Sequence, residues 1–290
     1  MAAKGVIAAT DGSEESLRAV EWAAREAVLR RDALRIVSVP TLLPRMSPDP
    51  AGRQTVAAVL EQATARALAS ATQRAAQTDP DLAVTTEMLT GSPAQALLKA
   101  AADASLLVVG SRGAGGFTAM ILGSVSRYLA IRAPCPVVVA REETKAVQRE
   151  VVVGIRDPDQ SAAALRFGFQ EATLRNARLM AVHTWAWSLP SSESVGTLTP
   201  QERAIMDGSD IRAYAAARLK SVLATCHENY PGVQAGWEIV HAHPARVLIA
   251  ASGRADLVVL GRHAAGSDIG SITYPVVSHA HGPVAIVPGE

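Results

Sequence analysis

The chain has 290 residues, of which 49% are hydrophobic and 4% aromatic, a composition typical of a folded α/β protein rich in Ala, Val and Leu. Its 28 Lys and Arg residues nearly cancel its 27 Asp and Glu residues, and without a basic block the sequence does not favour nucleic-acid binding. No apolar run approaches the roughly 18 residues that a membrane-spanning helix needs, and no signal-peptide pattern precedes the first strand, so we expect a cytoplasmic protein without a membrane partner.

Strands alternate with helices along the first half of the chain. The apolar run 5–10 predicts a strand that turns at Asp11-Gly12, and Ser13 is a good N-cap for a helix with Glu14 and Glu15 in its first turn. The next predicted elements are a strand at 34–39, a proline-rich loop at 40–50, a helix over about 52–77 and a strand near 83–88. A helix follows with Ser92 as its cap, Pro93 at its first position and Gln95 closing a capping box. The half ends with a strand at 105–109, a glycine loop, a helix over 124–132 and a strand at 136–140. This alternation predicts a parallel, doubly wound, Rossmann-like sheet of the α/β class.

The second half of the chain repeats this series. Segment 152–156 corresponds to segment 7–11 at an offset of 145 residues, whereas the strand at 257–261 corresponds to that at 106–110 at an offset of 151. A repeated pattern with shifting offsets indicates duplication followed by changes in loop length. We therefore predict two tandem domains, 1–143 and 149–290, joined by the charged stretch 141–150.

The most informative motif is the glycine loop that follows the strand at 105–109. Gly110, Gly113, Gly123 and Ser124 have the spacing G-x2-G-x9-G-S, and Ser124 can cap the helix that follows. Glycine lets backbone N–H groups approach an anion closely, and a helix N-terminus favours negative charge, so this loop is a candidate phosphate site. It is neither a Walker loop, since no Lys follows the last glycine, nor a G-x-G-x-x-G fingerprint.

Two other predicted strands end near the same crevice. In a doubly wound sheet, ligands bind outside the carboxyl ends of the strands where the strand order reverses, which brings Asp11, Val39 and Gly110 together. The Asp11 carboxylate can accept hydrogen bonds from a ribose hydroxyl or an adenine amine, although a turn or cap residue is the simpler interpretation. The main chain at Val39 can pair with an adenine edge, because backbone groups are free where a strand ends.

These residues resemble the nucleotide-binding signature of the universal stress protein family, which grips ATP. The resemblance covers essentially the full length, once per half, and also includes 91–94 and 133–136. It implies a fold of the adenine nucleotide alpha hydrolase-like kind, with ATP, alone or with Mg²⁺, as the ligand; Ser38 stands where the family often has His. The residues that it implies for nucleotide binding are Ala9, Thr10, Asp11, Val39, Gly110, Ser111, Arg112, Gly113, Gly123, Ser124 and Val125.

The same loop offers little catalytic apparatus. Cleavage of ATP needs an activated water, a base within reach or charge aimed at the leaving phosphate, and Arg112 is the one cation beside the loop in the sequence. The S-G-G-x-D-S and H-x-G-H motifs of related enzymes are missing. A stress-response module that binds ATP is therefore the favoured interpretation. A slow ATPase, an ATP-dependent transferase using Arg112 and a nucleotide-free scaffold remain as rivals.

The second half is altered at each point that a nucleotide would touch. Arg156 replaces Asp11, Ala264 replaces the second glycine, and the loop from Gly261 to Gly270 is four residues shorter than that from Gly110 to Gly123. Pro275 falls early in the following helix and removes an N–H group. We expect this half not to hold ATP in the usual way, unless Asp157 replaces the missing carboxylate after a slip of one residue.

All seven histidines lie in the second half, including His241-x-His243 and His279-x-His281. No third ligand is placed by spacing, so solvated or capping histidines are favoured over a metal site. Cys135 and Cys226 are expected to be reduced thiols in preference to a disulfide.

The last strand of each half is apolar and is expected near a sheet edge, and such an edge tends to pair with another copy. The resemblance implies the same, because members of that family pair there. We expect the two halves to face each other across a pseudo-twofold axis. A homodimer and a protein partner, which the sequence does not identify, are expected in addition.

Overall fold

The computed structural model describes residues 5–41, 53–113, 122–141, 147–157, 160–185, 209–262 and 269–289. The elements of the first half are β1 (Val6–Ala9), α1 (Glu14–Arg30), β2 (Leu34–Ser38), α2 (Arg53–Thr78), β3 (Val84–Met88), α3 (Pro93–Ala100), a 3-10 turn (Ala101–Asp103), β4 (Leu106–Gly110), α4 (Ser124–Arg132) and β5 (Val137–Ala140). Those of the second half are β6 (Glu150–Ile155), α5 (Ala162–Arg175), β7 (Arg178–Trp185), α7 (Ser209–Asn229), β8 (Ala235–His241), α8 (Pro244–Ser252), β9 (Leu257–Arg262), α9 (Thr273–His279) and β10 (Val284–Pro288).

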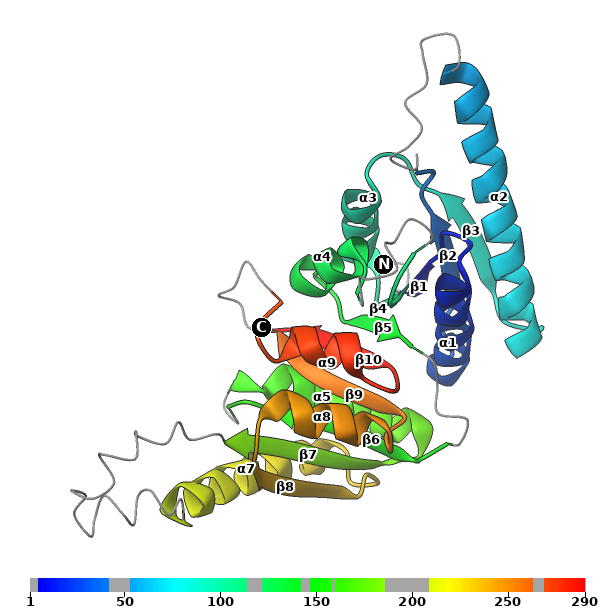
Figure 1. Cartoon of the computed structure of the whole chain (residues 1–290). Helices are drawn as coiled ribbons and strands as arrows, with labels where there is room; N and C mark the ends of the chain where they lie inside the picture. Colours follow the sequence, from blue (N-terminus) through cyan, green and yellow to red (C-terminus); the bar gives the residue numbers. More distant parts are fainter. Residues whose placement is uncertain are drawn as a thin grey trace, which may run out of the picture.

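All of these strands form one ten-stranded sheet with the order β3-β2-β1-β4-β5-β10-β9-β6-β7-β8 (Figure 1). Within each half the paired strands are parallel, which confirms the predicted doubly wound α/β fold. The halves meet at β5 and β10, which pair antiparallel with Val138 opposite Ala285. The order reads the same from both ends, as the expected pseudo-twofold relation requires. The apolar last strands therefore pair with each other inside one chain, and the outer edges of the sheet are β3 and β8.

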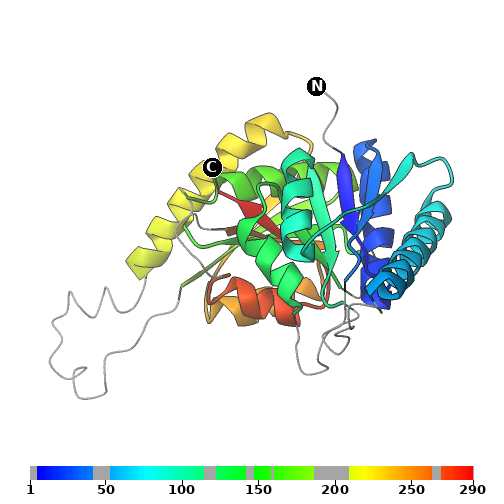
Figure 2. The ribbon, with the colours of Figure 1, turned by 90° about the horizontal axis from the view of Figure 1, so that it is seen from above.

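Helices cover both faces of the sheet. Alternate strand residues point to opposite faces, so Val6 and Ala8 enter a core with α1, α2, α5 and α7, whereas Ile7 enters a second core with α3, α4, α8 and α9. Both cores contain residues of both halves. The helices α2 and α7 lie at opposite ends of the molecule (Figure 2). None of the described helices has the length and apolar character that crossing a membrane requires.

The helix ends confirm the predicted N-cap positions Ser13 and Ser92 and contradict the predicted cap at Ser124 and the predicted capping box. Ser13 is the N-cap of α1, and its side chain accepts a hydrogen bond from the N–H of Ser16. Ser124 is the first residue of α4, and the N-cap is Gly123, so the prediction that Ser124 caps this helix is wrong.

Ser92 is the N-cap of α3 but makes no side-chain capping bond. The predicted capping box does not form there, because Gln95 donates from Nε2 to the hydroxyl of Tyr128 at 2.7 Å. A partner on α4 thus replaces the local backbone partner of Gln95.

A buried four-charge cluster joins α1 to α5 across the seam between the halves. Glu26 and Arg30 on α1 recur as Glu171 and Arg175 on α5, both 145 residues later. Each arginine pairs with the glutamate of its own helix and with that of the other helix; Arg30 Nε lies 2.5 Å from Glu26 Oε1, and Arg175 Nη2 lies 2.5 Å from Glu26 Oε2. The Glu26 and Glu171 side chains are 1% and 0% exposed. Both copies of one duplicated Glu-x3-Arg motif therefore meet in the interface between α1 and α5.

Aromatic rings complete this cluster in the same reciprocal way. Arg30 lies over the ring of Phe167 at 5.7 Å, and Arg175 lies over the ring of Trp22 at 5.6 Å. Trp22 and Phe167 are again 145 residues apart. Cation–π contacts of this kind favour a guanidinium in a partly desolvated place.

A second reciprocal contact uses helix C-termini, where a cation is favoured by the helix dipole. Arg141 of the first half donates to the carbonyl oxygens of Val277 and Ser278 at the end of α9. Arg262 of the second half donates to the carbonyl oxygen of Ala133 at the end of α4, at 2.8 Å. Each half therefore caps a helix of the other.

Both cysteines are free thiols, as predicted. Cys135 is buried, and burial raises the pKa of the Cys226 thiol. Neither residue cross-links the halves.

Candidate functional site

The structure brings three strand ends of the first half to one edge of the sheet. β1 lies between β2 and β4, with Val6 opposite both Leu34 and Leu106. Because the three strands are parallel, their carboxyl ends lie side by side. The strand order reverses at this point, between β1 and β4, which is the usual place for a ligand in such a sheet.

A hydrogen-bonded turn at the end of β1 fixes Thr10 and Asp11. Thr10 is buried; its N–H donates to the carbonyl of Val37 at 2.9 Å, and its hydroxyl lies 3.0 Å from that of Ser16. Asp11 is exposed, and its Oδ1 accepts from the N–H of Ser13 at 3.0 Å and from the Ser13 hydroxyl at 2.6 Å. Gly12 supplies the positive φ of +82° that this turn needs. Asp11 is therefore an ordered turn residue whose Oδ1 is held by Ser13 and whose Oδ2 lies beside Gly113.

At the end of β4, Gly110 and Gly113 each leave no room for a Cβ, but different atoms occupy the space. A Cβ at Gly110 would lie 2.9 Å from the carbonyl oxygen of Glu15, so this glycine lets α1 pack closely against the strand. A Cβ at Gly113 would collide with Oδ2 of Asp11. The first phosphate-loop glycine thus serves the fold, and the second keeps the loop beside the Asp11 carboxylate.

Hydrogen bonds tie the far end of the loop back to β4. The N–H of Gly123 donates to the carbonyl of Ser111 at 2.8 Å, and the hydroxyl of Ser126 donates to the carbonyl of Gly110 at 2.7 Å. Ser124 is exposed at the N-terminus of α4, and Val125 packs against the core. Gly115 and Gly116 lie in 114–121, outside the described residues.

Val39 follows β2 at the neighbouring strand end and is half-buried. Its carbonyl oxygen accepts from the Thr41 hydroxyl at 3.0 Å, so the expectation of a free carbonyl there is wrong. The donor is an exposed local side chain, which a ligand can displace.

Arg112 stands beside Glu15, with 3.7 Å between Nη2 and Oε1, and its side chain is 46% exposed. The carboxylate comes from the first turn of α1, where the sequence indicates only a helix-dipole role. The sequence interpretation also missed Ser16 and Ser126, whose hydroxyls hold the two loops that carry the site. A Ser in the first turn of each helix is the signal by which the sequence marks them, because such hydroxyls form hydrogen bonds with nearby backbone groups.

The equivalent edge of the second half has a different geometry. Arg156 is exposed directly after β6, and the Asp157 carboxylate accepts from Nε2 of Gln160 at 3.0 Å. Gly270 has φ +83°, and α9 begins only at Thr273, with Pro275 as its third residue. The helix N-terminus is therefore displaced from the glycine, whereas in the first half α4 begins directly after Gly123; Ala264 lies outside the described residues.

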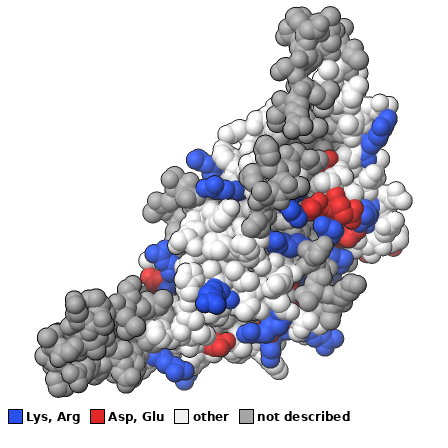
Figure 3. All heavy atoms as spheres, viewed as in Figure 1, with Lys and Arg blue, Asp and Glu red and all other residues white. Residues whose placement is uncertain are grey.

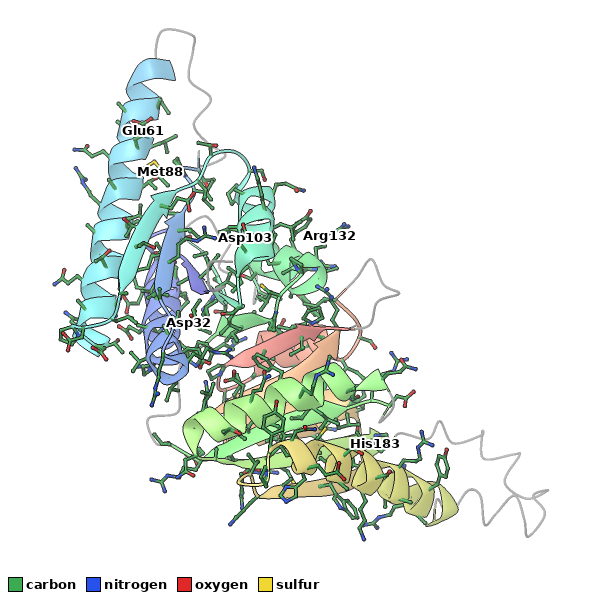
Figure 4. The ribbon with its side chains drawn as sticks, turned by 180° about the vertical axis from the view of Figure 1, so that it is seen from behind. Asp32, Glu61, Met88, Asp103, Arg132 and His183 are labelled. Carbon is green, nitrogen blue, oxygen red and sulfur yellow. The ribbon has the colours of Figure 1, made fainter. Side chains whose placement is uncertain are left out.

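Two histidines of the second half take part in structural contacts, one through its side chain and one through its backbone. His183 on β7, labelled in Figure 4, donates from Nδ1 to the carbonyl of Ile155 at 3.0 Å. The backbone N–H of His281 donates to the Ser252 hydroxyl at 2.8 Å. Within the described ranges, no three His, Cys, Asp or Glu side chains gather closely enough to hold a metal ion.

Known proteins similar to this chain have the same organisation. The model of the Universal stress protein family matches residues 3–141 and again 148–288. A universal stress protein of Mycobacterium tuberculosis is 31% identical over 302 residues, covering 97% of this chain and 96% of the relative, and one of Mycolicibacterium smegmatis is 32% identical over 296 residues, covering 98% and 96%. The crystal structure of a universal stress protein from Archaeoglobus fulgidus has a TM-score of 0.68 at 17% identity, covering 99% of this chain and 97% of that one.

Proposed function

The chain belongs to the universal stress protein family, and on this premise we propose that it is an ATP-binding regulatory protein of the stress response. The first domain, 1–143, holds the nucleotide, and the second domain, 149–290, is a degenerate copy that supports it. The observation that carries this proposal is the meeting of Asp11, Val39 and the Gly110–Gly113 loop at the strand-order reversal of the first half.

In this proposal the two parts of ATP are held by different groups. Asp11 and the main chain at Val39 hold the nucleoside, with Ala9 and Thr10 forming the floor at the end of β1. The phosphates lie against the backbone of Ser111, Arg112 and Gly113 and against the N-terminus of α4. The α4 groups are Gly123, Ser124 and Val125. Mg²⁺, where bound, would neutralise phosphate charge.

Gly123 supports a ligand on this side of the loop. Its φ is −67°, which any residue adopts, and a Cβ would make only ordinary contact, 3.5 Å from the carbonyl oxygen of Ser111. Neither the backbone nor the packing of the described residues requires glycine here. An approaching phosphate does require the space, because it needs the N–H groups of α4 without a side chain in front of them.

Binding is favoured over catalysis because Arg112 already pairs with Glu15 at 3.7 Å. A slow ATPase or an ATP-dependent transferase would need that guanidinium to turn to the leaving phosphate. Steady-state turnover of ATP by the purified protein separates these rivals from a binding module.

The experiment that tests the proposal is identification of the nucleotide released from the protein by denaturation, with its amount per chain. We expect one ATP per chain. Two equivalents would contradict a degenerate second domain, and a chain that neither carries ATP nor binds it when added would favour the nucleotide-free scaffold.

Assembly and location complete the proposal. A cytoplasmic homodimer would have to use the outer edge strands β3 or β8 or a helical surface, because β5 and β10 are already paired with each other. ATP would order the crevice and so present a surface to a protein partner. Sedimentation with and without ATP tests both assembly and its dependence on nucleotide.

A further inference from the structure

Two hydrogen bonds tie the start of α4 to the end of β4 in the first half. The hydroxyl of Ser126, the third residue of α4, donates to the carbonyl of Gly110, the last residue of β4, at 2.7 Å. The N–H of Gly123 donates to the carbonyl of Ser111 at 2.8 Å. Ser126 is 6% exposed, and a hydrogen bond in such a weakly polar place is stronger than the same bond in water. The first turn of α4 is therefore fixed against the strand end.

This tie sets the position of the N–H groups at the start of α4. The first bond within the helix runs from the N–H of Arg127 to the carbonyl of Gly123 at 2.9 Å. The N–H groups of residues 124–126 precede that bond, and Gly123, the N-cap, has no side chain that could accept from them. In α1, by contrast, the side chain of Ser13 accepts from the N–H of Ser16. The start of α4 therefore offers donors to a group that lies outside the helix.

The charges of α4 do not oppose an anion at this position. The helix contains no Asp or Glu, and its first turn has no acidic residue. Figure 3 shows that the acidic side chains on this face of the molecule gather mainly near α1 and not over α4. A phosphate at the start of α4 therefore meets the positive end of the helix dipole without repulsion from a carboxylate of the same helix.

The second half shows that the fold does not depend on the Ser126 bond. At an offset of 147 residues Thr273 corresponds to Ser126, and at an offset of 151 residues Gly261 corresponds to Gly110. Thr273 is the first residue of α9, whereas Ser126 is the third residue of α4. Within the part of the chain that the structure describes, no hydrogen bond joins the Thr273 hydroxyl to the carbonyl of Gly261. The bond is therefore a feature of the half to which the nucleotide is assigned.

We infer that Ser126 is a positioning residue that determines how strongly the site prefers a nucleoside triphosphate to the bare nucleoside. The inference rests on the proposed function, in which the phosphates lie against both the backbone of residues 111–113 and the N-terminus of α4. The Ser126 hydroxyl joins these two parts, so it sets the distance between their N–H groups. The nucleoside is assigned to Asp11 and Val39, on strand ends that this bond does not contact. Loss of the hydroxyl therefore weakens the hold on the phosphates and leaves that on the nucleoside.

Calorimetric titration of the nucleotide-free full chain with ATP and, separately, with adenosine tests this role. Ser126→Ala should weaken ATP binding about threefold to tenfold, the value of one neutral hydrogen bond, and leave adenosine binding unchanged. Ser126→Thr keeps a hydroxyl and should keep the affinity for ATP. The matched control is Ser161→Ala, because Ser161 is 7% exposed at the N-cap of α5 and its hydroxyl donates to the carbonyl of Asp157, also at 2.7 Å. It removes an equivalent bond from the second half, so ATP affinity should be unchanged.

The outcomes distinguish a failure of this inference from a failure of the proposed function. If the unaltered chain binds neither ATP nor adenosine, both are wrong. If it binds ATP, and Ser126→Ala either binds ATP equally well or loses ATP and adenosine by the same factor, the inference alone is wrong. An equal loss of ATP affinity in Ser161→Ala would assign the effect to lost stability. The same loss in Ser126→Thr as in Ser126→Ala would assign it to packing, and either result also overturns the inference.

Discussion

The first and second halves of the molecule agree in their packing and differ at the ends of their strands. Both have the same strand order, and α1 and α5 both end in a left-handed residue, Arg31 and Asn176, which are 145 residues apart. At the carboxyl end of the first strand, however, Asp11 in one half becomes Arg156 in the other. The two copies thus agree in the residues that join them and differ at the strand ends where the proposed ligand binds in the first half.

Glycine illustrates the same difference at one pair of positions. Gly270 has φ +83°, so its backbone needs glycine, whereas Gly123 has φ −67° and does not. The aligned glycines therefore differ: the backbone conformation requires glycine at 270, whereas at 123 the proposed phosphate contact is the reason for it. A motif match alone would treat them as equivalent.

The largest expected effect comes from the seam, where the halves should behave identically. Glu171→Ala and Glu26→Ala each leave two buried arginines short of a partner, so each should lower the free energy of unfolding by about 3–5 kcal/mol. Denaturant unfolding with a common slope measures both. If one of the two variants lowered the free energy of unfolding by less than about 1 kcal/mol, the two glutamates would not contribute equally to the cluster.

The pH dependence of stability should reflect the titration of Glu171, one of the two buried glutamates of the seam. Desolvation raises the pKa of Glu171 from 4.5 to about 7, against the opposing effect of Arg175 and Arg30. Between these values the unfolded chain loses the proton that the folded chain keeps, so the contribution of Glu171 to stability is fully present below pH 4.5 and is lost as pH rises to about 7. The loss from this group is at most about 3 kcal/mol. Unfolding curves from pH 4.5 to 8 measure it.

Two matched variants test whether the pH dependence comes from the Glu171 carboxyl or from another acidic group. Glu171→Gln should flatten that part of the stability profile, although the variant is less stable throughout. Glu87→Gln, at a side chain that is 46% exposed beside Arg35, should leave the slope as it is. An unchanged slope in Glu171→Gln would assign the titration to another group.

ATP binding should break the symmetry between the halves. Asp11→Ala removes the proposed nucleoside contact and should weaken ATP about tenfold to a hundredfold, the value of a charge-assisted hydrogen bond. Asp157→Ala, one residue beyond the Arg156 position, is the control and should change ATP affinity less than about twofold, well under the 1.4 kcal/mol of a tenfold change. Calorimetric titration measures both, and equal losses would mean that Asp157 has replaced the missing carboxylate.

Sequence periodicity predicted the alternating elements, the duplication and the convergence of strand ends, because these depend on local apolar patterns and on the rules of parallel sheets. It predicted that the apolar edges at 136–140 and 284–287 pair with another copy, whereas they pair with each other inside one chain, because an apolar pattern alone does not identify the partner strand. The prediction that Gln95 closes a capping box was wrong for a similar reason, because its actual partner, Tyr128, lies on α4, which is distant in the sequence. The Glu26-x3-Arg30 repeat was readable at its 145-residue offset, but its meaning required the two helices to be seen side by side.

The smallest and sharpest test uses the aligned glycines. Gly123→Ala adds a methyl group in an allowed conformation with ordinary contacts, so unfolding should be nearly unchanged while ATP affinity falls tens-fold through loss of space for phosphate. Gly270→Ala forces alanine to φ +83° and should cost about 1–2 kcal/mol of stability with ATP affinity intact. Thermal unfolding and ATP titration of both variants should therefore show lower ATP affinity for Gly123→Ala alone and lower stability for Gly270→Ala alone. If instead Gly123→Ala lost stability and kept ATP, its glycine would be structural like that of its twin, and the reason for assigning the phosphates to the first half would disappear.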